Sequence, residues 1–366
     1  MTANPAATMS HASTKVLVYR LGSLGDGLLA IPTFRAIRKA YPTAEITFLT
    51  NLPVKTQAAP LVEVLEQTNL CNSVIAYPIR LRDPLALWRL WRKLNSARYH
   101  LVVHLTAPRG RWNSLRDFLF FKLALIPHVI GVPWSGKDMR CKLDPASGRY
   151  EWEAKRLARR VRKLGKVDLE DDRSWDLELT TSELEAAREI LIQHGLGGEF
   201  MSASIGTKWD TNDWTNPNWL EMLKQVAERA PKNTGLVLLG SADEFARSEL
   251  LKDCWSGPRI NLSGKVGVRV SAALMRLSKV FIGHDSGPMH LAATVGVPCV
   301  GIFSARNPPG RWFPRGKNNT IFYNQTPCYG CELETCLKYG KKCIMAHSPR
   351  DVATSLLRYF SIGKPL

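Results

Sequence analysis

The feature that most constrains the fold of this sequence is a regular alternation of short, β-branched apolar segments with longer segments of helical periodicity. The first apolar segment, KVLVYR at 15–20, leads into a glycine-rich turn and then into a helical segment at 28–40. Apolar segments at 45–50, 73–78 and 100–105 repeat the pattern. Strands that alternate with helices predict parallel sheets covered by helices, which is an α/β fold.

A second series of the same kind follows in the other half of the chain. A helical segment at 182–194 opens it, and Thr181 and Ser182 precede Glu185 at capping-box spacing. The predicted strands lie at 200–205, 235–239, 279–283 and 299–303, with helices at 217–230, 243–253, 270–277 and 287–295. Because 366 residues are too many for one ordinary core, the two series predict two domains.

Composition suggests where these domains begin and end. Residues 1–14 are small and polar and predict a disordered tail, and 15–166 form the first Rossmann-like domain. The acidic, polar stretch at 167–181 is the predicted linker, and 182–348 form the second Rossmann-like domain. The last segment, 349–366, contains a helix that we predict to pack back on the first domain.

No segment has the length and composition of a membrane-spanning helix. The longest apolar run, at 118–126, contains Lys122 and is much shorter than the roughly 18 residues that a span needs. The N-terminal tail lacks the basic region and apolar core of a signal peptide. We therefore expect a cytoplasmic protein.

The chain has 50 basic and 32 acidic residues, a net charge of +18. Residues 80–116 hold nine basic residues and one acid (net +8), and residues 137–166 hold eleven and four (net +7). Such an excess predicts nucleic acid, membrane phospholipid or a phosphorylated substrate as partner, unless the charges only solvate the surface. Interspersed tryptophans favour a docking surface: Trp88, Trp91, Trp112, Trp134 and Trp152. The aromatic–basic signature of an RNA-recognition domain is absent from the sequence, so we expect no nucleic-acid partner.

The first constellation of chemical interest is the turn GSLGDG at 22–27, which follows the first strand and opens a helix. Its glycines let a ligand approach the backbone, and free N–H groups at a helix start favour anions or oxygens. Asp26 is either the N-cap of this helix or a carboxylate that takes a proton from an attacking hydroxyl.

The second constellation, FIGHDSGPMH at 281–290, is an apolar strand that ends in Asp-Ser-Gly and opens another helix. Either Asp285 or Ser286 caps the helix. The positive helix end at Ser286 and Gly287 then predicts a diphosphate-binding site. His290, on the first turn, either donates to a phosphate oxygen or is a buried core histidine.

Together, the strand–GSLGD–helix opening and the segment DSGPMHLAA at 285–293 resemble glycosyltransferase family 9, the ADP-heptose:lipopolysaccharide heptosyltransferases. The resemblance extends from about residue 15 to the last helix. It implies a GT-B fold, with two Rossmann-like domains facing a central cleft, an inverting mechanism, and no metal at the chemical step. It also implies that Asp26 is the catalytic base. The residues matching the family's diphosphate-binding turn are Asp285, Ser286, Gly287 and His290.

The segment GTKW at 206–209 resembles the family's second phosphate loop, with Thr207 and Lys208 as candidate ligands. The family often carries a lysine two residues before the tryptophan that matches Trp214. This chain has Asn212 at that position, so Lys208 is the candidate for the missing charge.

The segment GSADE at 240–244 follows a predicted strand and resembles the loop that contacts the donor ribose in the family. Glu244 is the candidate ligand, since a carboxylate can accept hydrogen bonds from both ribose hydroxyls. The alternative is an ordinary acidic residue in the first turn of a helix.

Four cysteines lie close together near the C-terminal end: Cys328, Cys331, Cys336 and Cys343. Four thiols at this density can bind zinc tetrahedrally, and a cytoplasmic protein is not expected to join them in disulfides. Their spacing is not a standard zinc pattern, so ordinary packing is the alternative. We predict no cofactor for catalysis and leave a structural zinc ion open.

These features predict a transferase that moves a sugar onto an acceptor hydroxyl. By the resemblance, the donor is ADP-heptose on the second domain, and the acceptor is the lipopolysaccharide core or a related glycolipid on the first. Gly22, Ser23 and Gly25 form the predicted acceptor-side loop. Two other functions remain open: a nucleotide-sugar epimerase or hydrolase on the same fold, and a catalytically inactive protein that binds nucleotide sugars or anions.

The basic bias of the first domain also predicts where the acceptor is met. An anionic glycolipid at the inner face of the cytoplasmic membrane would attract the arginines of this domain. The aromatic residues Trp88, Trp91 and Trp112, with residues 118–121, are candidates for interfacial contact. The alternative is that these aromatic side chains belong to the core and that the arginines are merely solvated.

Overall fold

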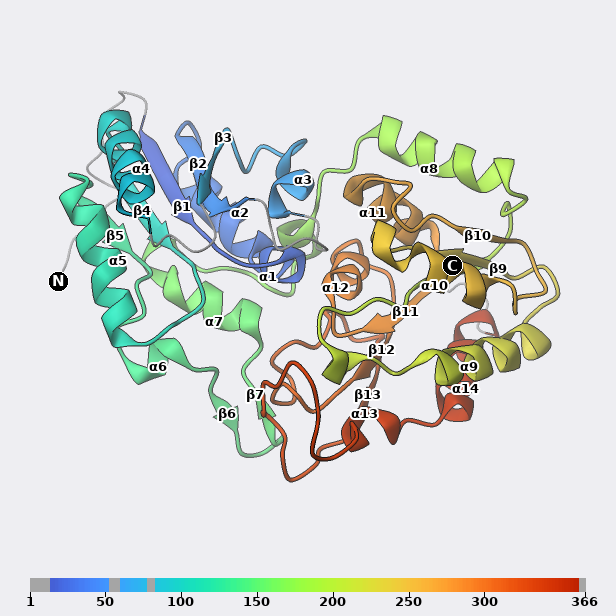
Figure 1. Cartoon of the computed structure of the whole chain (residues 1–366). Coiled ribbons are helices and arrows are strands. Elements are labelled where there is room, and N and C mark those ends of the chain that lie inside the picture. Colours follow the sequence, from blue (N-terminus) through green and yellow to red (C-terminus); the bar gives the residue numbers. More distant parts are fainter. Residues whose placement is uncertain (1–13, 53–59, 78–82, 362–366) are drawn as a thin grey trace. The chain divides into compact units, whose positions relative to one another are not determined.

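The computed structural model of the chain describes residues 14–52, 60–77 and 83–361. It divides into two compact units, with the boundary between Trp175 and Asp176. Each unit contains a parallel sheet covered by helices (Figure 1), which confirms the two predicted Rossmann-like α/β domains. Apart from Thr14, the predicted N-terminal tail lies outside the described residues.

The first unit has a sheet of five parallel strands in the order β3-β2-β1-β4-β5, which is the order of a Rossmann domain. The strands are β1 (Lys15–Tyr19), β2 (Glu45–Asn51), β3 (Ser73–Tyr77), β4 (Leu101–His104) and β5 (His128–Ile130). The helices are α1 (Leu24–Leu28), α2 (Ile31–Ala40), α3 (Leu61–Leu65), α4 (Pro84–Ala97), α5 (Arg111–Leu123), α6 (Gly136–Met139) and α7 (Glu153–Arg160). A two-stranded hairpin of β6 (Leu143–Asp144) and β7 (Arg149–Tyr150) precedes α7.

Helices cover both faces of this sheet because its inner strands are apolar on both sides. Leu90 of α4 and Phe121 of α5 pack in one core cluster with Leu17 of β1. From α2, Phe34 meets Phe48 of β2 edge to face, with ring centroids 4.8 Å apart. The inner strands β1 and β4 are therefore buried on both faces.

The second unit has six parallel strands in the order β10-β9-β8-β11-β12-β13, which is the complete Rossmann order. The strands are β8 (Phe200–Ser204), β9 (Gly235–Leu238), β10 (Arg259–Asn261), β11 (Val280–His284), β12 (Cys299–Phe303) and β13 (Thr320–Tyr323). The helices are α8 (Thr181–Gln193), α9 (Asn216–Arg229), α10 (Phe245–Lys252), α11 (Val268–Leu277), α12 (Gly287–Thr294), α13 (Lys342–Met345) and α14 (Pro349–Ser361).

In each sheet the strand order reverses between two central strands, β1 and β4 in the first unit and β8 and β11 in the second. Ligands of open α/β sheets bind outside the carboxyl ends of the strands at such a switch point. The loop after β1 is the GSLGDG turn, and the loop after β11 is the DSGPMH turn. Both predicted constellations therefore lie at the switch points of their own sheets.

The prediction that the last helix packs back on the first domain is wrong. Helix α14 lies against α9 in the second unit (Figure 1). Val352 and Leu356 of α14 are fully buried in the same cluster as Trp219 and Met222 of α9. The apolar side of α14 is thus buried in the core of the second unit.

The predicted linker at 167–181 is packed on both sides of the unit boundary. Trp175 is fully buried in the first unit, where it stacks on Trp152 at 5.2 Å between ring centroids. Two residues later, the carbonyl of Leu177 accepts a hydrogen bond from Arg269 of the second unit. The N-cap of the following helix is Thr180, one residue before the predicted pair, and its partner in the capping box is Glu183.

In the second basic segment, 137–166, three arginines of α7 fold inward, whereas the other eight basic residues are exposed. Arg156 is 1% exposed and pairs with Glu153 at 2.5 Å between Nη2 and Oε1. Arg159 is bound to Glu151 at 2.7 Å. Arg160 is buried and donates to three backbone carbonyls. These arginines hold the loops around α7 together.

Candidate active site

In the first unit, the loop after β1 begins α1 with a capping box. Ser23 is the N-cap and Asp26 is the third residue of the helix. The carboxylate Oδ2 of Asp26 accepts from the Ser23 amide at 2.8 Å and from the Ser23 hydroxyl at 2.9 Å. The hypothesis that Asp26 is itself the N-cap is therefore wrong by position, although its carboxylate does stabilise the helix start.

Gly22 is required for this arrangement because its backbone passes directly over Asp26. A Cβ at Gly22 would lie 2.6 Å from the Asp26 Cβ, and its φ of +156° is one that side chains rarely adopt. The amide of Gly22 donates to Asn51 Oδ1 of β2 at 2.8 Å, and the Leu21 amide donates to Thr106 Oγ1 at 3.1 Å. The loop is thus held by both neighbouring strands.

A buried cation lies behind Asp26. Arg20, the residue after β1, is 1% exposed. Its Nη2 donates to the Asp26 carbonyl at 2.6 Å and lies 3.6 Å from Asp26 Oδ1. Its Nη1 donates to the Leu105 carbonyl, after β4, at 2.7 Å. The Asp26 side chain keeps 27% of its surface exposed, so one face of its carboxylate is accessible to a substrate.

In the second unit, the loop after β11 opens α12. Ser286 is the N-cap by position, but its side chain makes no capping hydrogen bond, and its buried Oγ has no partner among the described residues. The N–H groups of the first turn and this hydroxyl are therefore available to an anion. Asp285 is turned aside, because its Oδ2 accepts from Asn307 Nδ2 at 2.9 Å.

His290 lies on the first turn of α12 and is 4% exposed. Its Nε2 is 3.8 Å from Asp285 Oδ1, and its Nδ1 has no hydrogen-bond partner in the part of the chain that the structure describes. The ring of Trp312 lies beside it, with ring centroids 6.2 Å apart. One ring nitrogen of His290 therefore has no protein partner among the described residues, and its role in binding a phosphate stays a prediction.

Glu244 lies at the carboxyl ends of β8 and β9. A Cβ added to Gly206 or to Gly240 would overlap its carboxylate, so both glycines make room for it. Burial raises the pKa of Glu244, opposed by the neighbouring Ser241. Its buried Oε2 makes no hydrogen bond within the described residues. A carboxylate aimed over two strand ends in this way is not an ordinary helix-surface acid.

Lys208 is the candidate to supply the charge of the family lysine that is missing at Asn212. The structure places Lys208 at an exposed position in the loop after β8, whereas Asn212 is buried. Lys208 is exposed, with its Nζ 4.7 Å from the centroid of the Trp209 ring. Arg306, after β12, lies over the same ring at 5.3 Å. Thr207 donates to the Trp209 carbonyl at 3.4 Å. Lys208 of this loop and Arg306 of the loop after β12 therefore lie over the same tryptophan ring.

Asn212 is 3% exposed and occupies a neutral, hydrogen-bonded site. Its Oδ1 accepts from Ser304 Oγ at 2.5 Å, and its Nδ2 donates to the Asp285 carbonyl at 3.5 Å. Asn212 thus ties the loops after β8, β11 and β12 to one another.

Sequence reasoning missed a buried polar group next to this site. His284, the last residue of β11, is fully buried and accepts from the Trp214 amide through Nε2 at 3.1 Å. Burial lowers the pKa of His284 to about 4, which keeps the ring neutral. Asp213 is held by Arg247 at 2.8 Å, which lowers the pKa of Asp213 although burial opposes it. The only sequence signal was the placement of His284 at a strand end.

The four cysteines are free thiols, and the described residues contain no group of histidine, cysteine and acidic side chains arranged to hold a metal ion. Their segment instead braces the strand-end loops. The Gly330 amide donates to the Ala305 carbonyl at 2.8 Å, and Thr211 Oγ1 donates to the Leu333 carbonyl at 2.9 Å. Arg306 donates to the carbonyls of residues 332 and 333.

Comparison with known proteins decides the family. The model of glycosyltransferase family 9 (heptosyltransferase) matches residues 87–341, well over half of the chain. The chain belongs to glycosyltransferase family 9. It is therefore a glycosyltransferase, and the GT-B fold implied by the resemblance is confirmed.

Curated relatives and solved structures agree with this family 9 assignment. Lipopolysaccharide heptosyltransferase 1 of Pseudomonas aeruginosa is 23% identical over 88% of this chain and 87% of its own length. The family 9 glycosyltransferase of Veillonella parvula superposes with a TM-score of 0.72 at 18% identity, covering 96% of this chain and 99% of that one. The E. coli ADP-heptose lps heptosyltransferase II has a TM-score of 0.64 at 18% identity, covering 95% and 99%.

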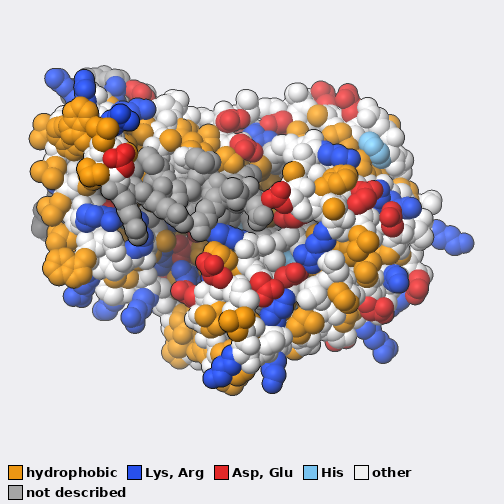
Figure 2. Space-filling view, viewed as in Figure 1, with side chains coloured by type: hydrophobic (Ala, Val, Ile, Leu, Met, Phe, Trp, Pro, Cys, Tyr) orange, Lys and Arg blue, Asp and Glu red, His pale blue; other side chains and the backbone are white. Residues whose placement is uncertain are grey.

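Within the described residues, no helix of this family 9 chain is both long and apolar enough to span a membrane. The first unit nevertheless exposes large apolar side chains, as Figure 2 shows over α4 and α5. Trp112 is 82% exposed and Trp88 49% exposed, in agreement with two of the predicted interfacial residues. Phe121 is buried, and Trp91 and Phe120 pack on the core, so the prediction is wrong for these three.

Proposed function

We propose that this glycosyltransferase transfers heptose from ADP-heptose to the lipopolysaccharide core or a related glycolipid, with inversion and without a metal ion in the chemical step. The observation that carries the proposal is the pair of switch-point loops. One presents a partly exposed carboxylate, Asp26, and the other a helix start with unused donors at Ser286 and His290. The names of the relatives supply the sugar and the acceptor class.

The donor binds to the second unit in this proposal. Its diphosphate lies at the start of α12, where the Ser286 hydroxyl, the Gly287 amide and the free His290 nitrogen donate hydrogen bonds. Glu244 accepts from the ribose hydroxyls, for which its unpaired Oε2 is suited. A structure of E. coli heptosyltransferase WaaC holds ADP, at a TM-score of 0.61 to this chain.

The acceptor hydroxyl attacks the anomeric carbon from the face opposite the diphosphate. Asp26 takes the hydroxyl proton as the new C–O bond forms and the bond to the diphosphate oxygen breaks, so ADP leaves with its electron pair. The negative charge that develops on ADP is met by the α12 N-terminus and by cationic side chains at the same edge, Lys208 and Arg306.

We further propose that the first unit meets its acceptor at an anionic membrane surface. Helix α5 carries an exposed apolar stripe at helical spacing, and its neighbours on the same helix are basic. The stripe consists of Trp112, Leu115, Leu119 and Leu123, and the basic border of Arg111, Arg116 and Lys122. Each basic residue near an anionic membrane gains about 1 kcal/mol, and exposed leucines and tryptophan suit the headgroup boundary.

A single assay series tests the reaction. Purified protein is incubated with ADP-heptose, with and without a lipopolysaccharide core acceptor, and ADP and product are both measured. Acceptor-dependent ADP release with an inverted product linkage, unaffected by a chelator, is the expected result. ADP release without acceptor would show a hydrolase, an epimerised donor would show an epimerase, and binding without turnover would show an inactive binding protein.

A further inference from the structure

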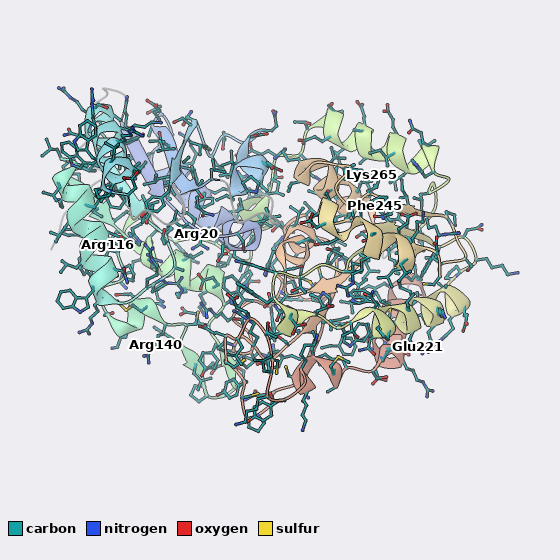
Figure 3. The ribbon with its side chains drawn as sticks, viewed as in Figure 1. Arg20, Arg116, Arg140, Glu221, Phe245 and Lys265 are labelled. Carbon is teal, nitrogen blue, oxygen red and sulfur yellow. The ribbon has the colours of Figure 1, made fainter. Side chains whose placement is uncertain are left out.

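Arg20 is a cation in an unusual place. It follows β1 directly and lies inside the first unit, in contrast to Arg116 on the outer surface of α5 (Figure 3). Burial lowers the pKa of Arg20, opposed first by the charge of Asp26. A buried guanidinium is stable only when it is paired and hydrogen-bonded. Both terminal nitrogens of Arg20 meet this need, through Asp26 Oδ1 at 3.6 Å and two backbone carbonyls, while its buried Nε has no partner among the described residues.

The contacts of Arg20 fix Asp26 in two ways. The hydrogen bond of 2.6 Å to the Asp26 carbonyl holds the backbone of the residue. Arg20 approaches one carboxylate oxygen, Oδ1, while Ser23 binds the other, Oδ2, through two donors. Oδ2 is therefore committed to the capping box, and Oδ1 is the oxygen left for a substrate proton.

We propose that Arg20 is the positioning residue of the catalytic base: through the Asp26 carbonyl and Oδ1, it holds the carboxylate so that Oδ1 accepts the proton of the acceptor hydroxyl. This inference rests on the proposed role of Asp26. Arg20 touches no substrate and moves no proton. Arg20 follows β1 and donates to the Leu105 carbonyl after β4. Both strand ends therefore help to fix the orientation of the Asp26 carboxylate.

A double-mutant cycle between Arg20 and Asp26 tests the proposal. Arg20→Lys keeps a positive charge but cannot reach the Leu105 and Asp26 carbonyls together, so we expect kcat to fall by about 100-fold, the effect of an active-site misplacement of about 1 Å. The KM for ADP-heptose stays near wild type, because the donor binds to the other unit. In the Asp26→Asn background, Arg20→Lys changes the residual rate by no more than about twofold, the limit for additive effects.

Arg160→Lys is the matched control, because Arg160 is also a buried arginine that binds backbone carbonyls in the first unit but is not bonded to residue 26. Any loss it causes should be the same in the wild-type background and in the Asp26→Asn background. A loss from Arg20→Lys that is equally large in both backgrounds would show a merely structural role and overturn the proposal, and so would a normal kcat in the single variant.

Two further outcomes separate this proposal from the proposed function. If Asp26→Asn retains near-normal turnover, the base assignment fails, whereas a dead Asp26→Asn with a fully active Arg20→Lys removes only the role of Arg20. If Arg20→Lys does not fold, Arg20→Gln is made in the wild-type protein and in the Asp26→Asn protein. Urea unfolding then measures the loss of stability that Arg20→Gln causes in each background. The loss of stability should be smaller when residue 26 is already neutral, and an equal loss would overturn the pairing.

Discussion

The two oxygens of one carboxylate, Asp26, have different surroundings. Oδ2 receives two hydrogen bonds from Ser23, and Oδ1 lies 3.6 Å from a guanidinium nitrogen that is shielded from water. The same capping box occurs in α6, where Asp138 accepts from Ser135. Asp138 Oδ1 also lies 3.6 Å from an arginine, Arg159, but that side chain is more exposed than Arg20. What distinguishes Asp26 is its place at the switch point of the sheet and the deep burial of the cation behind it.

We expect Asp26→Asn to lower kcat by about 10²–10⁴-fold, because the amide keeps the shape of the side chain but cannot take a proton. Donor KM should remain near the wild-type value. Acceptor-dependent ADP release measures both. The matched control is Asp138→Asn, which removes the same capping-box carboxylate from α6. If both variants lose activity equally, the loss at residue 26 reflects helix capping and not base catalysis.

At the donor site, Gly287→Val should weaken ADP binding without unfolding the protein, because a branched side chain would crowd the first turn of α12. We expect ADP to bind the wild type about tenfold or more tightly than adenosine, since one charge-assisted hydrogen bond contributes about 1.5–3 kcal/mol. Calorimetric titration gives both affinities. Gly267→Ala is the control, because an added Cβ at that helix start meets no neighbouring atom. Equal binding of adenosine and ADP would rule out this phosphate site.

At the scale of elements, α5 is unusual in being apolar on both its inner and outer sides. Phe121 faces the core, while Leu119 and Leu123 are 48% and 68% exposed. Monomeric soluble proteins rarely leave such a contiguous stripe uncovered, and the arginines and lysines at its border match an anionic lipid surface.

We expect the protein to co-sediment with anionic vesicles at low salt, and less at high salt. Leu119→Gln with Leu123→Gln should reduce binding to anionic vesicles. The exposed basic residues of the neighbouring predicted contact helix, α4, are tested by Arg89→Gln, Arg92→Gln and Lys93→Gln together, which should reduce the salt-sensitive part of the binding. Ile192→Gln with Leu250→Gln is the control, since these exposed side chains lie on helices of the second unit. Equal binding to neutral and anionic vesicles would contradict the electrostatic contribution.

The cysteine segment is expected to act by bracing the loops after β8 and β12, with or without a metal ion. Cys328→Ser with Cys331→Ser should lower the thermal unfolding temperature and weaken ADP binding, while sparing the first unit. Metal analysis of protein purified without chelator or affinity metal accompanies the measurement. Stoichiometric zinc that disappears in the double variant would establish a metal site, and unchanged stability would contradict the bracing role.

Local signals in the sequence were sufficient to predict the inner strands of both sheets, most helices and the two turns at strand ends, but not the edge strands β5, β10 and β13 or the hairpin of β6 and β7. The contacts that give those turns their chemistry were not predictable, because their partners are far apart in the chain. Arg20 binds Leu105, and Asn212 binds Ser304. Helix α5 was missed because apolar residues on both faces obscure helical periodicity. The burial of Arg160 was missed because a run of arginines normally indicates a solvated surface.

For the molecule as a whole, stability should depend on pH through His284. Its folded pKa is about 4, whereas an unfolded histidine titrates near 6.5. The unfolded chain therefore takes up a proton first as the pH falls, so this contribution to stability is complete above about pH 6.5 and is lost between about 6.5 and 4.

We expect the free energy of unfolding of wild type, measured with urea, to fall across this range and the slope to be reduced in His284→Gln. The glutamine can still accept from the Trp214 amide but does not titrate. His194→Gln is the control, because His194 is exposed. Identical slopes in wild type and His284→Gln would show that this histidine does not couple folding to pH.

Because Gly206 and Gly240 leave room for Glu244, substitutions at the three positions should have related effects in a mutagenesis screen. The two glycines lie on different strand ends, yet any larger residue at either would displace the same carboxylate. A saturation mutagenesis screen for loss of nucleotide binding should therefore return both positions with nearly the same tolerance profile as Glu244 itself. Covariation among the three positions would then show that their side chains compete for the same space. It would not show that either glycine contacts the nucleotide.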